Sequence, residues 1–207
     1  AMLSITILWV FQLQAQKSSQ GTLSFDLPVM VDSTSTLIIP TRYSTSLFTS
    51  NKFALWGDVY ANIVFYDYKK DSSNRLFKRD TYIMGFNSFN KYLYANTPHK
   101  YFTSHHLLYR VKNNDHNTNG RIDEKDPAVL YVSDINGMNL KAITRADENV
   151  VSYELYEKLN FALLKIQRDS DGNKNFDDGD ASYYYVKLDL NTMKLGNKIE
   201  VNQPVTD

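Results

Sequence analysis

Strand-like runs that end in aspartate recur along this chain, and they constrain its fold more than any other feature. They read NIVFYD at Asn62–Asp67, AVLYVSD at Ala128–Asp134 and YYYVKLD at Tyr183–Asp189. β-Branched and aromatic residues dominate these runs, which favours strands over helices. An apolar run precedes each of them, and a turn with a further short run follows. The chain therefore reads as three copies of a strand–loop–strand–turn–strand unit.

The three units repeat with a period of about 54 residues. FALW at Phe53–Trp56 in the first unit matches FALL at Phe161–Leu164 in the third, and LLY at Leu107–Tyr109 lies midway. Turn-forming residues at Asp71–Asn74 and Asn136–Gly137 separate the later runs of the units. This pattern predicts an all-β fold of antiparallel meander sheets.

The same pattern predicts the domain organisation. A length of 207 residues suits one domain with a substantial core. We expect one β domain over residues 17–207, with repeats near 50–100, 101–150 and 151–201. The window Asp147–Leu159 is compatible with either a helix or a bent strand, because apolar residues recur at every fourth position in it.

One unit carries a more specific pattern. LYVSDINGMNLKAIT, at Leu130–Thr144, resembles a blade of the TolB-type β-propellers: a strand ending in Asp, a Gly-centred turn, and a strand of the form Asn-Leu-x-x-Ile-Thr. The match covers about 15 residues and is weaker in the other units. The wider layout, which begins at Ala61–Phe77, also resembles uncharacterised bacterial exported proteins. The resemblance implies propeller-like blades and says nothing about activity.

Three blades are fewer than a closed propeller normally has. The resemblance therefore implies a partial propeller, or a four-bladed one if the residues before Phe53 supply a further blade. An open arrangement would leave strand edges exposed, and exposed edges favour pairing with another chain. A homodimer is one expected outcome.

Two acidic loops of twelve residues stand out: DHNTNGRIDEKD at Asp115–Asp126 and DSDGNKNFDDGD at Asp169–Asp180. EF-hand-type loops bind calcium through oxygens at positions 1, 3, 5, 7 (a backbone carbonyl), 9 and 12, with glycine at position 6. The predicted ligands of the first loop are Asp115, Asn117, Asn119, Arg121 through its carbonyl, Asp123 and Asp126. Those of the second are Asp169, Asp171, Asn173, Asn175 through its carbonyl, Asp177 and Asp180.

The two loops differ at position 6. Gly120 occupies it in the first loop, which makes that loop the better-formed site on sequence grounds. Lys174 occupies it in the second, where a β-carbon opposes a left-handed turn by about 1–2 kcal/mol. The second loop compensates with one more carboxylate among its ligands. Aspartate at position 12 resembles the loops of dockerins more than those of EF-hands, which carry glutamate there.

These loops predict calcium at one or both sites. Solvated hairpin turns are the alternative, because Asp, Asn and Gly are also the usual turn residues. Magnesium is disfavoured, since it retains water and uses few carboxylates. The flanking runs are strand-like, so an ion would staple a β-hairpin rather than a helix pair. We expect such an ion to be structural, and its removal to loosen the loops.

Composition excludes several function classes. Lys plus Arg (23) equals Asp plus Glu (23) without a basic block, so nucleic-acid binding is not expected. The absence of cysteine excludes disulfides, thiolate metal sites and cysteine nucleophiles. Residues 1–16 begin with an apolar run that is too short to span a bilayer. This run is typical of a signal-peptide remnant or of an N-terminal strand, and the first reading predicts a periplasmic or secreted protein.

No catalytic motif is evident. The chain has no nucleophile elbow, no HExxH and no phosphate-binding glycine loop. Adjacent residues of a strand face opposite ways, so His105 and His106 are poor partners for one zinc ion. His116, at loop position 2, is expected to be solvated. Outside the loops, the carboxylates considered as an acid–base pair are Asp58, Asp67 and Glu154, and no pattern pairs them.

Aromatic side chains offer a possible ligand face or a blade core. The residues concerned are Trp56, Tyr60, Tyr82, Tyr92 and Tyr94. The leading interpretation is a non-enzymatic, calcium-stabilised, propeller-like binding or scaffold module of the bacterial cell envelope, with an unidentified protein or glycan partner. The alternatives are a calcium-dependent carbohydrate-active enzyme and a purely structural envelope protein.

Overall fold

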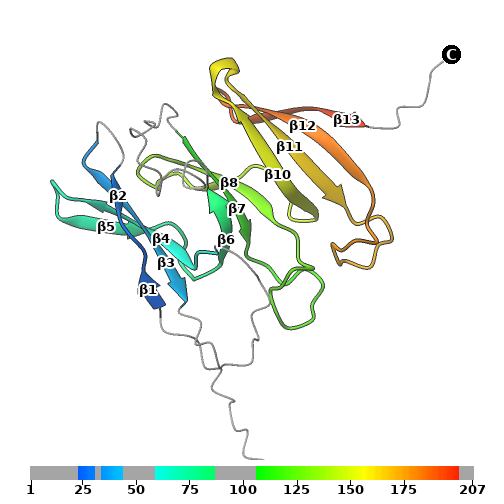
Figure 1. Cartoon of the computed structure of the whole chain (residues 1–207), viewed down its shortest axis with the longest axis horizontal. Coiled ribbons are helices and arrows are strands. Elements are labelled where there is room, and N and C mark those ends of the chain that lie inside the picture. Colours follow the sequence, from blue (N-terminus) through cyan, green and yellow to red (C-terminus); the bar gives the residue numbers. More distant parts are fainter. Residues whose placement is uncertain (1–22, 31–33, 44–58, 87–105, 201–207) are drawn as a thin grey trace, which may run out of the picture.

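The computed structural model describes residues 23–30, 34–43, 59–86 and 106–200, and this part of the chain is built from antiparallel β-sheets without an α-helix (Figure 1). A 3-10 turn, η1, covers Glu157–Leu159. The all-β prediction is therefore confirmed. The strands are β1 (Leu23–Phe25), β2 (Val29–Met30), β3 (Thr36–Tyr43), β4 (Asn62–Asp67), β5 (Ser72–Arg75), β6 (Tyr82–Phe86), β7 (His106–Lys112), β8 (Val129–Asp134), β9 (Lys141–Ala142), β10 (Glu148–Tyr156), β11 (Phe161–Arg168), β12 (Tyr183–Asp189) and β13 (Lys194–Glu200).

The strands form three sheets that follow one another along the chain. The first has the order β1-β3-β4-β5, with β2 also paired to β3. The second has the order β6-β7-β8-β9, and the third β10-β11-β12-β13. The three Asp-terminated runs form β4, β8 and β12. Each of them is the third strand in the order of its sheet. These three strand predictions are confirmed.

Two local expectations are resolved by the strand boundaries. The window Asp147–Leu159 is a strand: β10 pairs with β11 and carries a bulge between Val150 and Ser152 before η1 begins. The predicted turn at Asp71–Asn74 is wrong in its position. The reversal lies at residues 68–71, with Asp71 at φ 48°, and the following serines already belong to β5.

The middle sheet is buried on both faces, which explains why β7 reads as a nearly continuous apolar run. Leu107, Tyr109 and Val111 pack toward the first sheet, in one core cluster with Ile63 and Phe65. Leu108, between them in sequence, packs in a second cluster with the third sheet. Alternate side chains of one strand thus fill two cores. The remaining buried members of the second cluster are Leu130, Val132, Val150, Ala162, Leu164, Ile166, Tyr184, Val186, Leu188 and Met193.

A glycine fixes the approach of the first two sheets. Gly137 lies in the turn between β8 and β9 with φ +74°, and a β-carbon there would lie 2.2 Å from the ring of Phe65. Thr36 also donates a hydrogen bond to the amide oxygen of Asn136 in this turn (2.6 Å). The Gly-centred turn predicted at Asn136–Gly137 is therefore present, and it packs against β4.

Several expectations fall on residues outside the described ranges. These include the N-terminal segment 1–16, the run Phe53–Trp56, Asp58, His105 and the aromatic pair Tyr92 and Tyr94. Within the described ranges, no helix is long and apolar enough to cross a membrane.

Candidate functional site: two matched acidic loops

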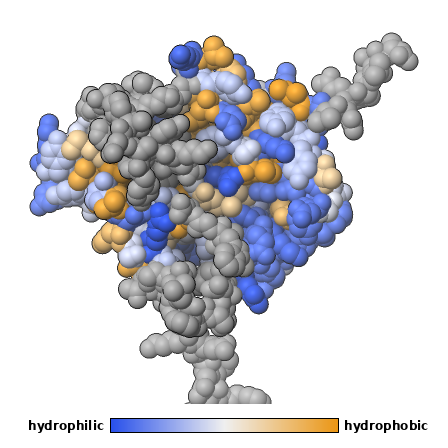
Figure 2. Space-filling view, viewed as in Figure 1, coloured by the Kyte–Doolittle hydropathy of each residue, from blue (hydrophilic) through white to orange (hydrophobic). Residues whose placement is uncertain are grey.

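The two acidic loops occupy equivalent places in neighbouring sheets. Asp115–Asp126 lies between the two central strands of the second sheet, β7 and β8. Asp169–Asp180 lies between the two central strands of the third, β11 and β12. Both loops emerge at the same side of the molecule (Figure 1). Figure 2 shows hydrophilic residues gathered over this side, at the lower right of the view.

The loops share one backbone conformation. Positions 4 and 6 have positive φ in both: Thr118 (60°) and Gly120 (85°) in the first loop, and Gly172 (75°) and Lys174 (63°) in the second. Each loop therefore places glycine at one of its two left-handed positions and a residue with a β-carbon at the other. The strain that a β-carbon causes in a left-handed conformation is expected at Lys174, and Thr118 carries the same strain in the first loop. Backbone strain therefore does not distinguish the two loops.

The internal hydrogen bonds also match. The carboxylate at position 1 accepts the position 6 N–H in both loops, from Gly120 to Asp115 and from Lys174 to Asp169, each at 2.8 Å. The side-chain oxygen at position 5 accepts the position 7 N–H, at 2.9 Å in the first loop and 2.6 Å in the second. These bonds point side-chain oxygens of both loops inward, which is the arrangement that an oxygen-liganded cation needs.

Position 12 differs between the loops. Asp126 and Asp180 are both buried, at 0% and 1% exposure. Asp126 is fully hydrogen-bonded, since its two oxygens accept the N–H groups of His116 (2.7 Å) and Asp123 (2.8 Å). Asp180 accepts the N–H and hydroxyl of Ser170 at Oδ1 (2.7 and 2.9 Å), but its buried Oδ2 has no hydrogen-bond partner.

The unpartnered oxygen of Asp180 belongs to a carboxylate cluster. Oxygens of Asp169, Asp171 and Asp180 lie within 4.8 Å of one another, the only such group of three His, Cys, Asp or Glu side chains in the described ranges. Burial opposes the charge on Asp180, yet hydrogen bonds, chiefly from Ser170, keep the pKa of this carboxyl below its usual value. Three converging anions with a buried free lone pair form a site that fits a cation.

The side chain beneath each loop also differs. Lys112, at the end of β7, is buried, and its ammonium donates to the carbonyls of Asp123 (3.1 Å) and Glu124 (2.7 Å). Burial lowers the pKa of Lys112 to about 8, although the nearby Asp126 opposes this shift. Gln167, at the end of β11, takes the equivalent place and donates to the carbonyls of Asp177 (2.9 Å) and Asp180 (3.1 Å). The first loop thus has a built-in positive charge, and the second has a neutral amide.

Sequence reasoning missed Lys112, Gln167 and Ser170. The only signal for the first two was a polar residue at the end of an otherwise apolar strand. Two further predicted ligands donate hydrogen bonds within their own loops: the side chain of Asn119 donates to Asp123 (3.1 Å), and that of Asn173 donates to Asp171 (2.8 Å).

The catalytic candidates are not brought together. Asp67 ends β4 in the first sheet, whereas Glu154 is exposed on β10 in the third. Hydrogen bonds from Ser35 and from the backbone of Lys69 and Lys70 hold the pKa of Asp67 below its usual value. Asp67 therefore caps a turn, and it does not form an acid–base pair with Glu154.

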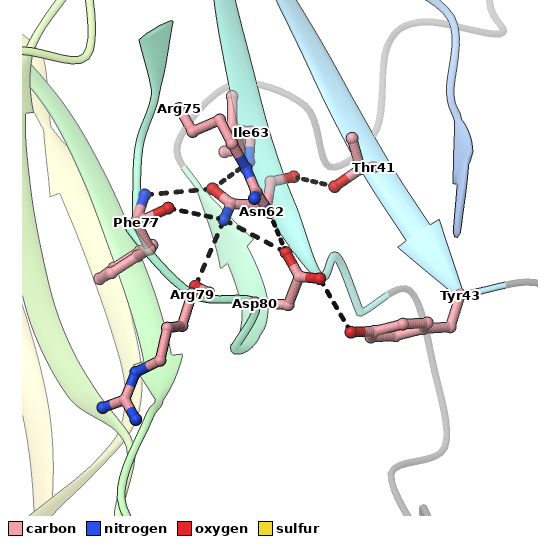
Figure 3. Close-up of polar contacts among 8 residues, drawn as sticks. All are labelled: Thr41, Tyr43, Asn62, Ile63, Arg75, Phe77, Arg79 and Asp80. Atoms are coloured by element: carbon pink, nitrogen blue, oxygen red, sulfur yellow. Dashed lines mark hydrogen bonds and ion pairs between the residues drawn. The ribbon is translucent and has the colours of Figure 1, made fainter. Parts of the chain in front are cut away.

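A second polar cluster surrounds the fully buried Asn62 (Figure 3). Its amide donates to the carbonyl of Phe77 (2.9 Å), and its oxygen accepts the N–H groups of Ile63 (2.9 Å) and Phe77 (3.1 Å). Asp80 accepts the hydroxyl of Tyr43 (2.9 Å) and pairs with Arg75. Burial, with the hydrogen bond to Asp80, raises the pKa of Tyr43 to about 12. Asn62 fastens the segment after β5 to β4, which is a structural role.

No protein-family model matches this chain, and comparison with curated proteins and with solved structures finds no significant match. The resemblance of Leu130–Thr144 to TolB-type blades therefore stays a prediction.

Proposed function

We propose that this chain is a non-enzymatic, calcium-stabilised module whose three sheets act as propeller-like blades of a binding or scaffold protein of the bacterial envelope. The observation that supports it best is the carboxylate cluster of Asp169, Asp171 and Asp180, with a buried oxygen left unpartnered on Asp180. A dication would balance two of the three negative charges of this cluster and occupy the free lone pair.

The donor chemistry favours calcium over other cations. Every predicted ligand offers oxygen, and calcium accepts six to eight oxygens in flexible geometries. Magnesium demands a tighter octahedron, and zinc prefers nitrogen or sulfur. An ion in the second loop would join the end of β11 to the start of β12, as a structural staple rather than a reactive centre.

Thermal unfolding with and without calcium tests this proposal. Calcium at about 100 times its Kd should raise the Tm above that in excess chelator by roughly 5–10 °C, because it binds only the folded state. Magnesium at the same concentration should give a smaller shift. The control is Asp178→Ala, which removes an exposed carboxylate at loop position 10 and should retain the calcium response. A Tm that is the same in calcium and in chelator would contradict the proposal.

A further inference from the structure

The two acidic loops contact one another although 54 residues separate their equivalent positions. The backbone N–H of Phe176, at position 8 of the second loop, donates to the carbonyl of Lys125 in the first (2.8 Å). The side chain of Asn117 donates to the side-chain oxygen of Asn175 (2.8 Å). Phe176 is buried, with its ring centroid 6.0 Å from that of His116. His116 is therefore half-buried against the neighbouring loop, and its expected solvation is wrong.

A second connection runs through the base of the loops. The N–H of Ala128, just after the first loop, donates to Asn149 (2.9 Å). The Asn149 amide donates to Gln167 (2.8 Å), whose own amide binds carbonyls of the second loop, those of Asp177 and Asp180. The loops are thus tied together at their sides and at their bases, across the boundary between the second and third sheets.

We infer that the two loops form one coupled pair, in which cation binding to the second loop raises the affinity of the first. The inference rests on the proposed calcium function and adds the order in which the two loops bind calcium. The second loop binds first, because it holds the carboxylate cluster and lacks a positive charge at its base. The first has a fully bonded Asp126 and the ammonium of Lys112 beside it.

The coupling follows from the contacts that the second loop supplies. A cation held by the Asn175 carbonyl would fix positions 7 and 8 of the second loop, and these positions contact Asn117 and Lys125 of the first. An ordered partner lowers the conformational cost of forming the first site. Repulsion between two dications opposes this effect. It is limited, because the loops together hold nine acidic and three basic side chains and stay negative with both ions bound.

Two glycine amides report the loops separately. Gly120 lies in the first loop and Gly172 in the second, and both N–H groups donate to the position 1 carboxylate of their own loop. Nitrogen–proton NMR during a calcium titration gives a midpoint for each. We expect the Gly172 signal to titrate at lower calcium than the Gly120 signal.

The decisive variant is Asp171→Ala, which removes an exposed ligand of the second loop. It should raise the calcium midpoint at Gly120 by about fivefold or more. Asp178→Ala removes the same charge from the same loop outside the ligand positions, so it separates coupling from electrostatics and should shift Gly120 much less. Asn175→Ala keeps the ligand carbonyl but removes the bond to Asn117, and it should move the Gly120 midpoint in the same direction as Asp171→Ala.

The outcomes are distinguishable. If both amides titrate and the Gly120 midpoint is the same in Asp171→Ala as in Asp178→Ala, the loops are independent and the inference is wrong, while the calcium function stands. If neither amide responds to calcium, the proposed function fails and the inference fails with it.

Discussion

The two acidic loops have the same chain path but balance their charges in different ways. In the first, both oxygens of Asp126 accept backbone N–H groups, and Lys112 places an ammonium at the base. In the second, Asp180 keeps a buried oxygen without a partner, and Gln167 supplies a neutral amide. Backbone geometry makes a loop able to surround a cation, whereas two or three side chains decide how strongly it needs one.

The largest effect is expected from isosteric changes at position 12. In excess chelator, Asp126→Asn should lower the free energy of unfolding by about 2 kcal/mol, because an amide N–H replaces an acceptor for a buried backbone N–H. Asp180→Asn should lower it by less, up to about 1 kcal/mol, because the fold favours the ionised carboxylate but the change also removes one of three converging charges.

Urea unfolding of both variants, in chelator and in calcium, checks this difference in size. In calcium, the cost of Asp180→Asn should grow, since a ligand charge is lost. If Asp180→Asn destabilises the protein equally in chelator and calcium, Asp180 is an ordinary buried acceptor and the contrast between the loops disappears.

The strands of this fold are largely predictable from the sequence because their signal is local. The three Asp-terminated runs mark β4, β8 and β12 directly. What was not predictable is which strands share a core. That both faces of β7 are buried depends on packing with strands on either side, and the position of the turn before β5 depends on Asp71 adopting a left-handed conformation.

The candidate site likewise has features that are encoded locally and features that depend on contacts between distant residues. Ligand spacing along twelve residues is encoded locally, so both loops could be found from the sequence. The unequal demand for a cation could not, because it depends on Lys112 and Gln167 reaching back to loop carbonyls. The contact between Lys125 and Phe176 joins two different sheets and has no local signal at all.

Exchanging the residues beneath the loops should reverse their difference. Lys112→Gln removes the positive charge and keeps an N–H donor, so we expect the calcium affinity of the first loop to rise about tenfold. Gln167→Lys should weaken the second loop by a similar factor. Lys125→Gln is the matched control: it removes an exposed charge of the first loop that water screens, so its effect should be smaller.

Site-resolved calcium titration through the Gly120 and Gly172 amides measures both exchanges. Equal effects of Lys112→Gln and Lys125→Gln would mean that the burial of Lys112 is irrelevant to the first loop, which contradicts this part of the comparison.

The smallest effects on the free energy of unfolding are expected at positions 4 and 6, whose left-handed conformation the two loops share. Gly120 (φ +85°) and Gly172 (φ +75°) have open space where a β-carbon would lie, so alanine there tests backbone conformation alone. Each Gly→Ala change should lower the free energy of unfolding by about 1 kcal/mol. Thr118→Gly and Lys174→Gly should raise it by less than that, because relief of strain is partly offset by a more flexible unfolded chain.

Urea unfolding at fixed calcium compares all four variants. A cost at Gly120 without one at Gly172 would show that the loops do not share a conformation in solution. Their unequal cation demand would then originate in the backbone rather than in Lys112, Gln167 and Asp180.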